Sequence, residues 1–160
     1  MRLLSLIILV LASTIQLFGQ EIKYNLRMVK PQNHYFQVEM ELTNFTENEL
    51  LVKMPVWAPG SYLVREFARN VDLVKAFDEN GKELSVIKTT KNAWSIARGK
   101  AKKVSVKYEV YAFELSVRTS FLDLTHGFVS GSGVFMYVDK YKEKTGKLEI
   151  FPYSDFKKIT

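Results

Sequence analysis

Cysteine is absent from the 160-residue sequence, and histidine occurs only twice, as His34 and His126. Without a thiol the chain can form neither disulfides nor thiolate metal ligands, and it cannot carry out cysteine-based catalysis. A catalytic zinc site usually takes three protein ligands, and the sequence contains no His-Glu-x-x-His motif or other recognisable ligand spacing. The sequence therefore predicts neither a metal site nor a catalytic residue in this chain.

Long apolar runs are also scarce, and the only one stands at the N-terminus. Arg2 is followed by an apolar stretch over residues 3–11 that only Ser5 interrupts, and small and polar residues then lead to Gln20. This order is typical of a secretory signal peptide, and the run is short for a membrane span, although an uncleaved anchor is the alternative. We predict a signal peptide over residues 1–19, a mature domain over residues 20–160, and export to the periplasm or surface of a bacterium.

The formal net charge is +6 at pH 7, from 23 Lys and Arg residues against 17 Asp and Glu residues. The basic residues are spread along the chain rather than gathered in one block. Such a spread is typical of a solvated surface, and an exported protein rarely meets nucleic acid. We therefore expect no nucleic-acid partner, and no membrane span beyond the signal peptide.

No stretch of ten residues after the signal peptide shows helical periodicity, whereas alternation of apolar and polar residues is frequent. Alternation with a period of two residues is the pattern of a strand with one buried face. Expected strands cover residues 22–28, 34–42, 50–54, 71–77, 84–89, 94–96, 104–112, 134–138 and 148–150. Short turns, including Asn80-Gly81, join the four strands from residue 71 to residue 112 into a predicted meander. The predicted fold is all-β, an antiparallel two-sheet β-sandwich with a short helical corner.

The helical corner lies in the stretch MPVWAPGSYLVREFARN at residues 54–70. Pro59-Gly60 suits the centre of a type II turn, because glycine accepts the positive φ of its second central position. After the turn, Leu63 and Phe67 lie four residues apart, which predicts about two helical turns. We expect three aromatic residues of this stretch to fill one end of the core, namely Trp57, Tyr62 and Phe67.

A second unusual stretch runs from residue 113 to residue 138. Ser120, Asp123 and His126 are the residue types of a hydrolytic triad, but closeness in sequence is no evidence that they meet in the required roles. The Ser-Gly-Ser-Gly segment at residues 130–133 lacks the context of a phosphate-binding loop. Its small residues instead indicate tight bends or close backbone approach.

Several motifs, taken in order, resemble one known family. They are PQNHYF at residues 31–36, MPVWAPGSY at 54–62, REFARN at 65–70, FELSVRTSFLD at 113–123 and His-Gly at 126–127. Their order and spacing are similar to those of the N-terminal domain of the bacterial glycyl aminopeptidases, and the similarity runs through nearly all of the mature chain.

The resemblance implies a β-sandwich that precedes a thermolysin-like catalytic domain and a PDZ domain in an exported zinc metallopeptidase. The zinc-binding His-Glu-x-x-His motif of that family belongs to the catalytic domain, and this sequence ends before it. We therefore expect a chain truncated before the catalytic domain and inactive alone. Zinc is expected in the missing catalytic domain, and the expected partners are that domain and the peptide substrate.

The resemblance also implies that the cleft-facing edge of this domain helps to hold the free amino end of a peptide. The candidates for the substrate cleft are Thr125, His126, Gly127, Ser130 and Gly131; shaping a domain interface is the alternative. The candidates for contact with the catalytic domain are Trp57, Tyr62, Arg65, Glu66 and Arg69. Pairing of the last three with one another at the surface is the alternative.

Two other functions stay open from the sequence. The first is a stand-alone exported β-sandwich that binds a peptide, a glycan or a protein partner, with Trp57, Tyr62 and the Gly/Ser loop lining its groove. The second is a remnant domain without activity. A downstream His-Glu-x-x-His motif would favour the peptidase, and a natural stop after Thr160 would favour the binding module.

Overall fold

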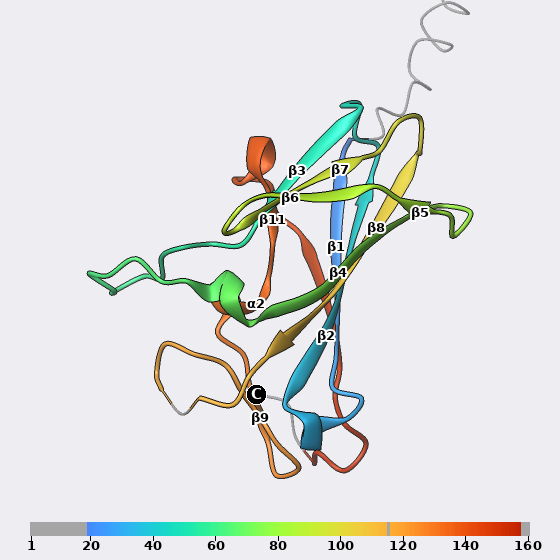
Figure 1. Cartoon of the computed structure of the whole chain (residues 1–160). Coiled ribbons are helices and arrows are strands. Elements are labelled where there is room, and N and C mark those ends of the chain that lie inside the picture. The colour runs from blue at the N-terminus through green and yellow to red at the C-terminus, as the bar shows by residue number, and fades with distance from the viewer. Residues whose placement is uncertain (1–18, 115, 158–160) are drawn as a thin grey trace, which may run out of the picture.

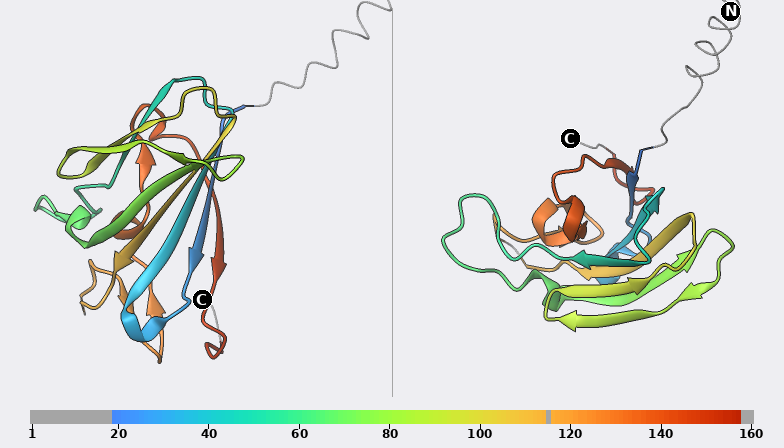
Figure 2. Two further views of the ribbon diagram at one scale, coloured as in Figure 1. Left: turned by 45° about the vertical axis from the view of Figure 1, so that its right-hand side comes forward. Right: turned by 90° about the horizontal axis from the view of Figure 1, so that it is seen from above.

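The computed structural model describes residues 19–114 and 116–157, so residues 1–18 of the predicted signal peptide lie outside the described part of the chain. Two sheets face one another in that part, joined by loops and short helices (Figures 1 and 2). The all-β, two-sheet sandwich predicted from the sequence is confirmed.

The larger sheet has six strands in the order β12-β1-β2-β8-β4-β5. Neighbouring strands are antiparallel, except that β12 runs parallel to β1. This parallel pair departs from the purely antiparallel sandwich that we expected. The strands are β1 (Glu21–Arg27), β2 (Tyr35–Thr43), β4 (Val71–Asp78), β5 (Glu83–Leu84), β8 (Lys103–Tyr111) and β12 (Lys147–Phe151).

The smaller sheet has four antiparallel strands in the order β11-β3-β7-β6, and a separate hairpin joins β9 to β10. Its strands are β3 (Glu49–Lys53), β6 (Val86–Thr90), β7 (Ala93–Ala97) and β11 (Tyr137–Val138), and the hairpin contains β9 (Phe121–Leu122) and β10 (Gly127–Phe128). The short helices are η1 (Pro31–Asn33), η2 (Phe67–Asn70), α2 (Gly131–Val134) and η3 (Asp139–Tyr141).

The core lies between the two sheets, where the alternation of each strand places its apolar residues. Every second residue of β2, from Phe36 to Leu42, is buried. Side chains of β1, β2 and β8 meet those of β3 and β7 in one apolar cluster, which includes Leu26, Met40, Leu50, Ile96 and Val106. The period-two pattern thus predicts correctly which face of β2 is buried.

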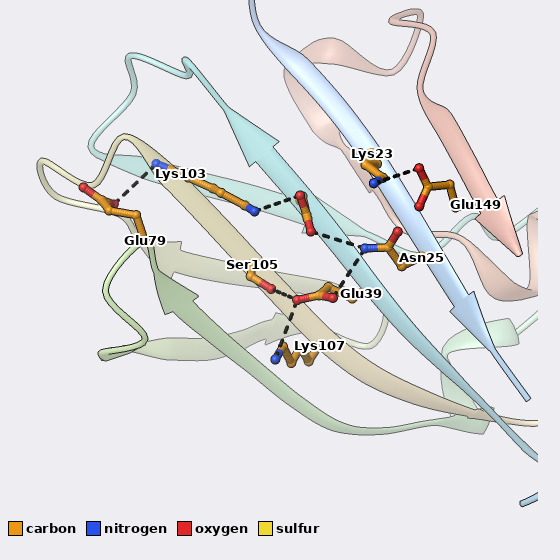
Figure 3. A network of polar contacts seen from close by, with 9 residues as sticks. Lys23, Asn25, Glu39, Glu79, Lys103, Ser105, Lys107 and Glu149 are labelled. Atoms are coloured by element: carbon orange, nitrogen blue, oxygen red, sulfur yellow. Dashed lines mark hydrogen bonds and ion pairs between the residues drawn. The ribbon is translucent and has the colours of Figure 1, made fainter. Parts of the chain in front are cut away.

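The other face of the six-stranded sheet carries a network of polar side chains (Figure 3). The Asn25 amide donates hydrogen bonds to the carboxylates of Glu39 and Glu41, at 3.4 and 3.2 Å. Lys107 and Lys103 form ion pairs with the same carboxylates, at 3.6 and 2.8 Å. Because this face is charged, only the opposite face of the sheet can pack against the core.

The predicted meander is wrong, although its turns are correct. β4 and β5 form a hairpin in the larger sheet around Asn80-Gly81, where Gly81 has a φ of 79°. β6 and β7 form a second hairpin in the smaller sheet, and β8 then returns to the larger sheet beside β4. Turn residues fix each hairpin locally, but the sheet that a hairpin joins depends on pairing with distant strands, which the local pattern does not encode.

The helical corner is shorter than predicted, because only η2 is helical. Pro59 and Gly60 form the expected turn, in which the Ser61 N–H donates to the Ala58 carbonyl at 3.0 Å and Gly60 has a φ of 75°. The Ser61 hydroxyl then accepts hydrogen bonds from the Leu63 N–H and the Arg65 side chain. Side-chain hydrogen bonds of this kind compete with helix formation, so the helix begins only at Phe67.

The aromatic residues of the corner do not all enter the core. Phe67 is buried, but Trp57 is 53% exposed and Tyr62 is fully exposed. The loop that carries both residues projects from the body of the domain (Figures 1 and 2). The prediction that Trp57 and Tyr62 fill the core is therefore wrong.

The strand predicted over residues 134–138 is also wrong in its secondary structure. The helix α2 ends at Val134, and β11 contains only Tyr137 and Val138. Val134, Met136 and Val138 are nevertheless buried, as the apolar pattern indicates. Burial of this segment is therefore predictable from its composition, whereas its backbone conformation is not.

Candidate functional site

A groove of about 850 Å³ opens between the β9–β10 hairpin, α2 and the end of β12. Its walls are mainly apolar, and its polar groups come from the hairpin and from the segment after β12. The apolar lining residues are Leu26, Met28, Phe128, Val129, Phe135, Leu148, Ile150, Pro152 and Phe156, and the other lining residues are Thr125, His126, Gly127, Gly131, Asp155 and Lys157. Four of the five residues predicted for a substrate cleft therefore line this one groove.

Asp123 fixes the conformation of the hairpin tip. Its Oδ1 atom accepts hydrogen bonds from the Thr125 N–H at 2.7 Å, the Thr125 hydroxyl at 2.6 Å and the His126 N–H at 3.0 Å. The hydrogen bond from the Thr125 hydroxyl, followed by that from the His126 N–H, lowers the pKa of Asp123 below its ordinary value. The carboxylate therefore stays ionised at neutral pH and holds Thr125 and His126 at the rim of the groove.

A continuous stack of four rings supports His126. Its imidazole stacks on Phe121 at 5.0 Å between ring centroids, Phe121 stacks on Phe113 at 5.2 Å, and Phe113 stacks on His34 at 3.7 Å. His34 was predicted as the first residue of a strand, but it ends η1 in the left-handed conformation, with a φ of 63°. Its Nδ1 atom lies 2.7 Å from the Leu122 carbonyl oxygen. The stack links both histidines of the chain and orients the exposed one.

The small residues of the site have different roles. A Cβ atom on Gly127 would lie 3.2 Å from Leu122 Cδ1 and 3.3 Å from Met28 Sδ, so glycine allows the hairpin to approach the groove wall closely. A Cβ atom on Gly131 would meet nothing nearer than Phe135, at 3.8 Å. Ser130 does not line the groove, and its N–H donates to the Ser120 hydroxyl at 2.9 Å.

Two tyrosine hydroxyls anchor the segment that forms one wall of the groove. The buried Tyr108 hydroxyl donates to the Val134 carbonyl and accepts from the Met136 N–H, both at 3.0 Å. The Tyr24 hydroxyl donates to the Met136 carbonyl at 2.7 Å. Burial raises the pKa of Tyr24 to about 12, and burial also raises the pKa of Tyr108 well above its ordinary value. Both hydroxyls therefore stay protonated and hold the wall at neutral pH.

The residues predicted to contact another domain lie together on the projecting corner. Three of them line a second, smaller hollow of about 330 Å³. Glu66 pairs with Lys91 at 3.1 Å and Arg69 with Glu114 at 3.6 Å, so the charged residues bind neighbouring segments rather than one another. The predicted residues that line this smaller hollow are Arg65, Glu66 and Arg69. Trp57 and Tyr62 expose their rings on the same corner.

Ser120, Asp123 and His126 do not form a hydrolytic triad. Ser120 is bonded to Ser130, and His126 Nδ1 lies 2.8 Å from the Thr125 hydroxyl and 3.6 Å from Asp123. Across residues 19–114 and 116–157, no three His, Asp or Glu side chains gather in a way that could hold a metal ion. In the same part of the chain, no helix has the length and apolar character to cross a membrane.

Sequence reasoning missed the side of the groove formed by β12 and the residues after it. Leu148, Ile150, Asp155 and Phe156 reach the hairpin because β12 pairs with β1. The apolar alternation of Leu148 and Ile150 was visible in the sequence, but nothing local indicates a parallel partner more than a hundred residues away.

Comparison with known proteins identifies a family and a structural relative. A family model described as the peptidase M61 N-terminal domain matches residues 23–160. No curated protein matches the sequence. Among solved structures, an aminopeptidase N family protein from Idiomarina loihiensis is similar, with a TM-score of 0.77 and 33% sequence identity. The match covers 82% of this chain and 22% of that one, so this chain spans about a fifth of the length of its structural relative.

Proposed function

The chain belongs to the peptidase M61 N-terminal domain family, and from this premise we propose that it is the non-catalytic N-terminal domain of an exported zinc aminopeptidase of the glycyl aminopeptidase type. In this role it packs on a catalytic domain and forms part of the cleft that receives the peptide. The observation that carries the proposal is the groove, which is lined by Thr125, His126, Gly127 and Gly131. The domain that contains it matches about a fifth of a longer chain of the aminopeptidase N family.

The chemistry of the groove suits the amino end of a peptide. Its apolar walls can cover side chains, and its polar rim offers the Thr125 hydroxyl, the His126 imidazole and the Asp155 carboxylate. A free peptide amine is a cation at neutral pH, and a carboxylate and a hydroxyl are suitable acceptors for its N–H groups. In the proposed role this rim holds the amine, while zinc in the catalytic domain supplies the hydrolytic chemistry.

The exposed corner supports the proposed contact with the catalytic domain. Val56, Trp57, Leu63 and Val64 expose apolar surface together with Tyr62. Aromatic residues with such exposure are typical of interface anchors, because they bury a large apolar area when a partner covers them. Export to the periplasm or cell surface follows in this proposal from the N-terminal apolar run.

A domain exchange tests the proposal. In the Idiomarina loihiensis protein, the matching 22% of the chain is replaced by this domain, and hydrolysis of glycine 4-nitroanilide and zinc content are measured. We expect an active, zinc-containing chimera, and neither zinc nor hydrolysis in this chain alone. Zinc and turnover in this chain alone would refute the non-catalytic assignment.

A variant of the chimera tests the groove. His126→Ala is expected to lower kcat/KM about tenfold or more while leaving the melting temperature nearly unchanged, because its side chain is 59% exposed. Lys82→Ala, in the turn between β4 and β5, is the matched control and should change neither quantity. Equal kcat/KM values for the two variants would remove His126 from the cleft.

A further inference from the structure

The outer edge of β12 is an open sheet edge. β12 stands at the end of the six-stranded sheet and pairs with β1 on one side, and no strand in the described part of the chain pairs with its other side. All five of its residues are exposed, including the apolar side chains of Leu148 and Ile150, at 46% and 38%. Such an edge presents unpaired backbone N–H and C=O groups.

The orientation of the backbone shows which groups are free. The Phe151 carbonyl accepts a hydrogen bond from the Met28 N–H at 3.0 Å, so the backbone of Phe151 faces the β1 side. Backbone groups of successive residues in a strand point to opposite edges. The N–H and C=O groups of Leu148 and Ile150 therefore point away from β1.

The other edges are better protected than this one. β5 and β11 have only two residues each, and β6 presents polar residues from Lys88 to Thr90. The two charged residues of β12 are drawn toward β1: Lys147 pairs with Glu21 at 2.7 Å and Glu149 with Lys23 at 2.9 Å (Figure 3 shows the latter pair). β12 also lacks a proline or a bulge, which are common devices against edge pairing.

We propose that the chain forms a two-fold symmetric dimer in which β12 pairs antiparallel with β12 of a second copy, with the symmetry axis at Leu148. In this register the outward backbone groups of Leu148 bond with their own symmetry mates, and those of Ile150 bond with Gly146 of the second copy. Lys147 then stands directly opposite Glu149 of the second copy, in a close, non-hydrogen-bonded pair.

Charge complementarity selects both the register and the occupant. A symmetry axis at Glu149 would place two carboxylates directly opposite each other, and an axis at Ile150 would leave both charges without a partner across the interface. The axis at Leu148 alone pairs opposite charges. It also brings the exposed Leu148 side chains of the two copies together, which covers apolar surface at the edge of the groove that Leu148 lines. This inference does not depend on the proposed peptidase role.

The absence of cysteine from the sequence allows a direct test. The chain from residue 20 to residue 160 contains every described strand and helix. In the dimer the two Leu148 Cα atoms lie about 5.5 Å apart, within the range of a disulfide. Leu148→Cys should therefore give a covalent dimer on mild oxidation, and Ile87→Cys, on the exposed edge strand of the other sheet, should not.

Sedimentation velocity from about 1 µM to 1 mM provides the second measurement. We expect a concentration-dependent dimer, and we expect Ile150→Pro to raise its dissociation constant about tenfold, because the variant removes two intermolecular N–H donors per dimer without affecting the side that faces β1. Ile87→Lys should leave the constant unchanged. A monomer at every concentration, or a dimer in which Leu148→Cys does not cross-link, would overturn the proposal. The edge would then be left for another occupant, such as a downstream domain or a peptide.

Discussion

Replacing Tyr108 by phenylalanine removes one oxygen atom from the centre of the domain, and we expect a large effect on stability. The Tyr108 hydroxyl is buried and is bonded both to the Val134 carbonyl and to the Met136 N–H. Without it, two backbone groups lose a partner in a place that water does not reach. An unsatisfied buried group costs about 1–3 kcal/mol, so the expected loss in free energy of unfolding for the two groups is about 2–6 kcal/mol.

Urea denaturation, followed by tryptophan fluorescence, measures this loss. A domain of this size is stabilised by about 5–15 kcal/mol, so the loss should move the unfolding midpoint clearly. Tyr35→Phe is the matched control, because its exposed hydroxyl bonds only to Asp72, at 3.1 Å, and its loss should change stability by less than about 0.5 kcal/mol. A Tyr108→Phe variant as stable as this control would refute the argument that the hydroxyl holds the groove wall.

The other tyrosine that holds the groove wall, Tyr24, loses its proton at alkaline pH. The pKa of Tyr24 is about 12 in the folded chain, against an ordinary value of 10. A raised folded-state pKa stabilises the fold below pH 10, and this contribution is lost as the pH rises from 10 to about 12. The melting temperature should therefore fall over this range, and less steeply in Tyr24→Phe.

Two further predictions concern other parts of the fold. The Tyr141 hydroxyl, together with the backbone of Glu47 itself and Lys140, lowers the pKa of Glu47 to about 2, so stability should fall as the pH drops from 4.5 to about 2. Melting curves over this range should show a shallower fall for Glu47→Gln, and an equal slope would contradict the assignment. A Cβ atom on Gly146 would lie 2.8 Å from the Tyr24 ring, so Gly146→Ala should lower the free energy of unfolding by about 1–3 kcal/mol. Gly131→Ala, whose Cβ atom would lie 3.8 Å from its nearest neighbour, should be neutral in the same urea titration.

The parts of the fold that are predictable from sequence are those in which a local pattern has one physical solution. The alternation of β2 from Phe36 to Leu42 fits only a strand with one buried face, and Asn80-Gly81 fits only a tight turn. Assignment of strands to sheets is different in kind. β12 could join either edge of either sheet according to its own sequence, and its pairing with β1 depends on where the whole chain leaves an edge free.

The same distinction applies to the groove. Thr125, His126 and Gly127 belong to one hairpin, so the resemblance of a single motif was enough to bring them together. Asp155 and Phe156 reach the groove only through β12, and Tyr108 supports it from the middle of a distant strand. Buried tyrosines that bond to the backbone of another segment leave no sequence signal, because the hydroxyl partner is a main-chain group that every residue has.

The wrong prediction for Trp57 and Tyr62 is informative for the same reason. Large aromatic residues are usually buried, yet Trp57 satisfies its indole N–H internally, by donating to the Ser61 carbonyl at 2.6 Å, and turns much of its apolar ring outward. Because the indole N–H is already hydrogen-bonded within the loop, covering the ring with a partner costs little free energy of desolvation. Under the proposed function, a catalytic domain that covers the corner would bury these aromatic residues, and the sequence rule would then hold. Trp57→Ala in the chimera should then weaken the contact between the domains, while the free energy of unfolding of this chain alone changes by less than about 1 kcal/mol.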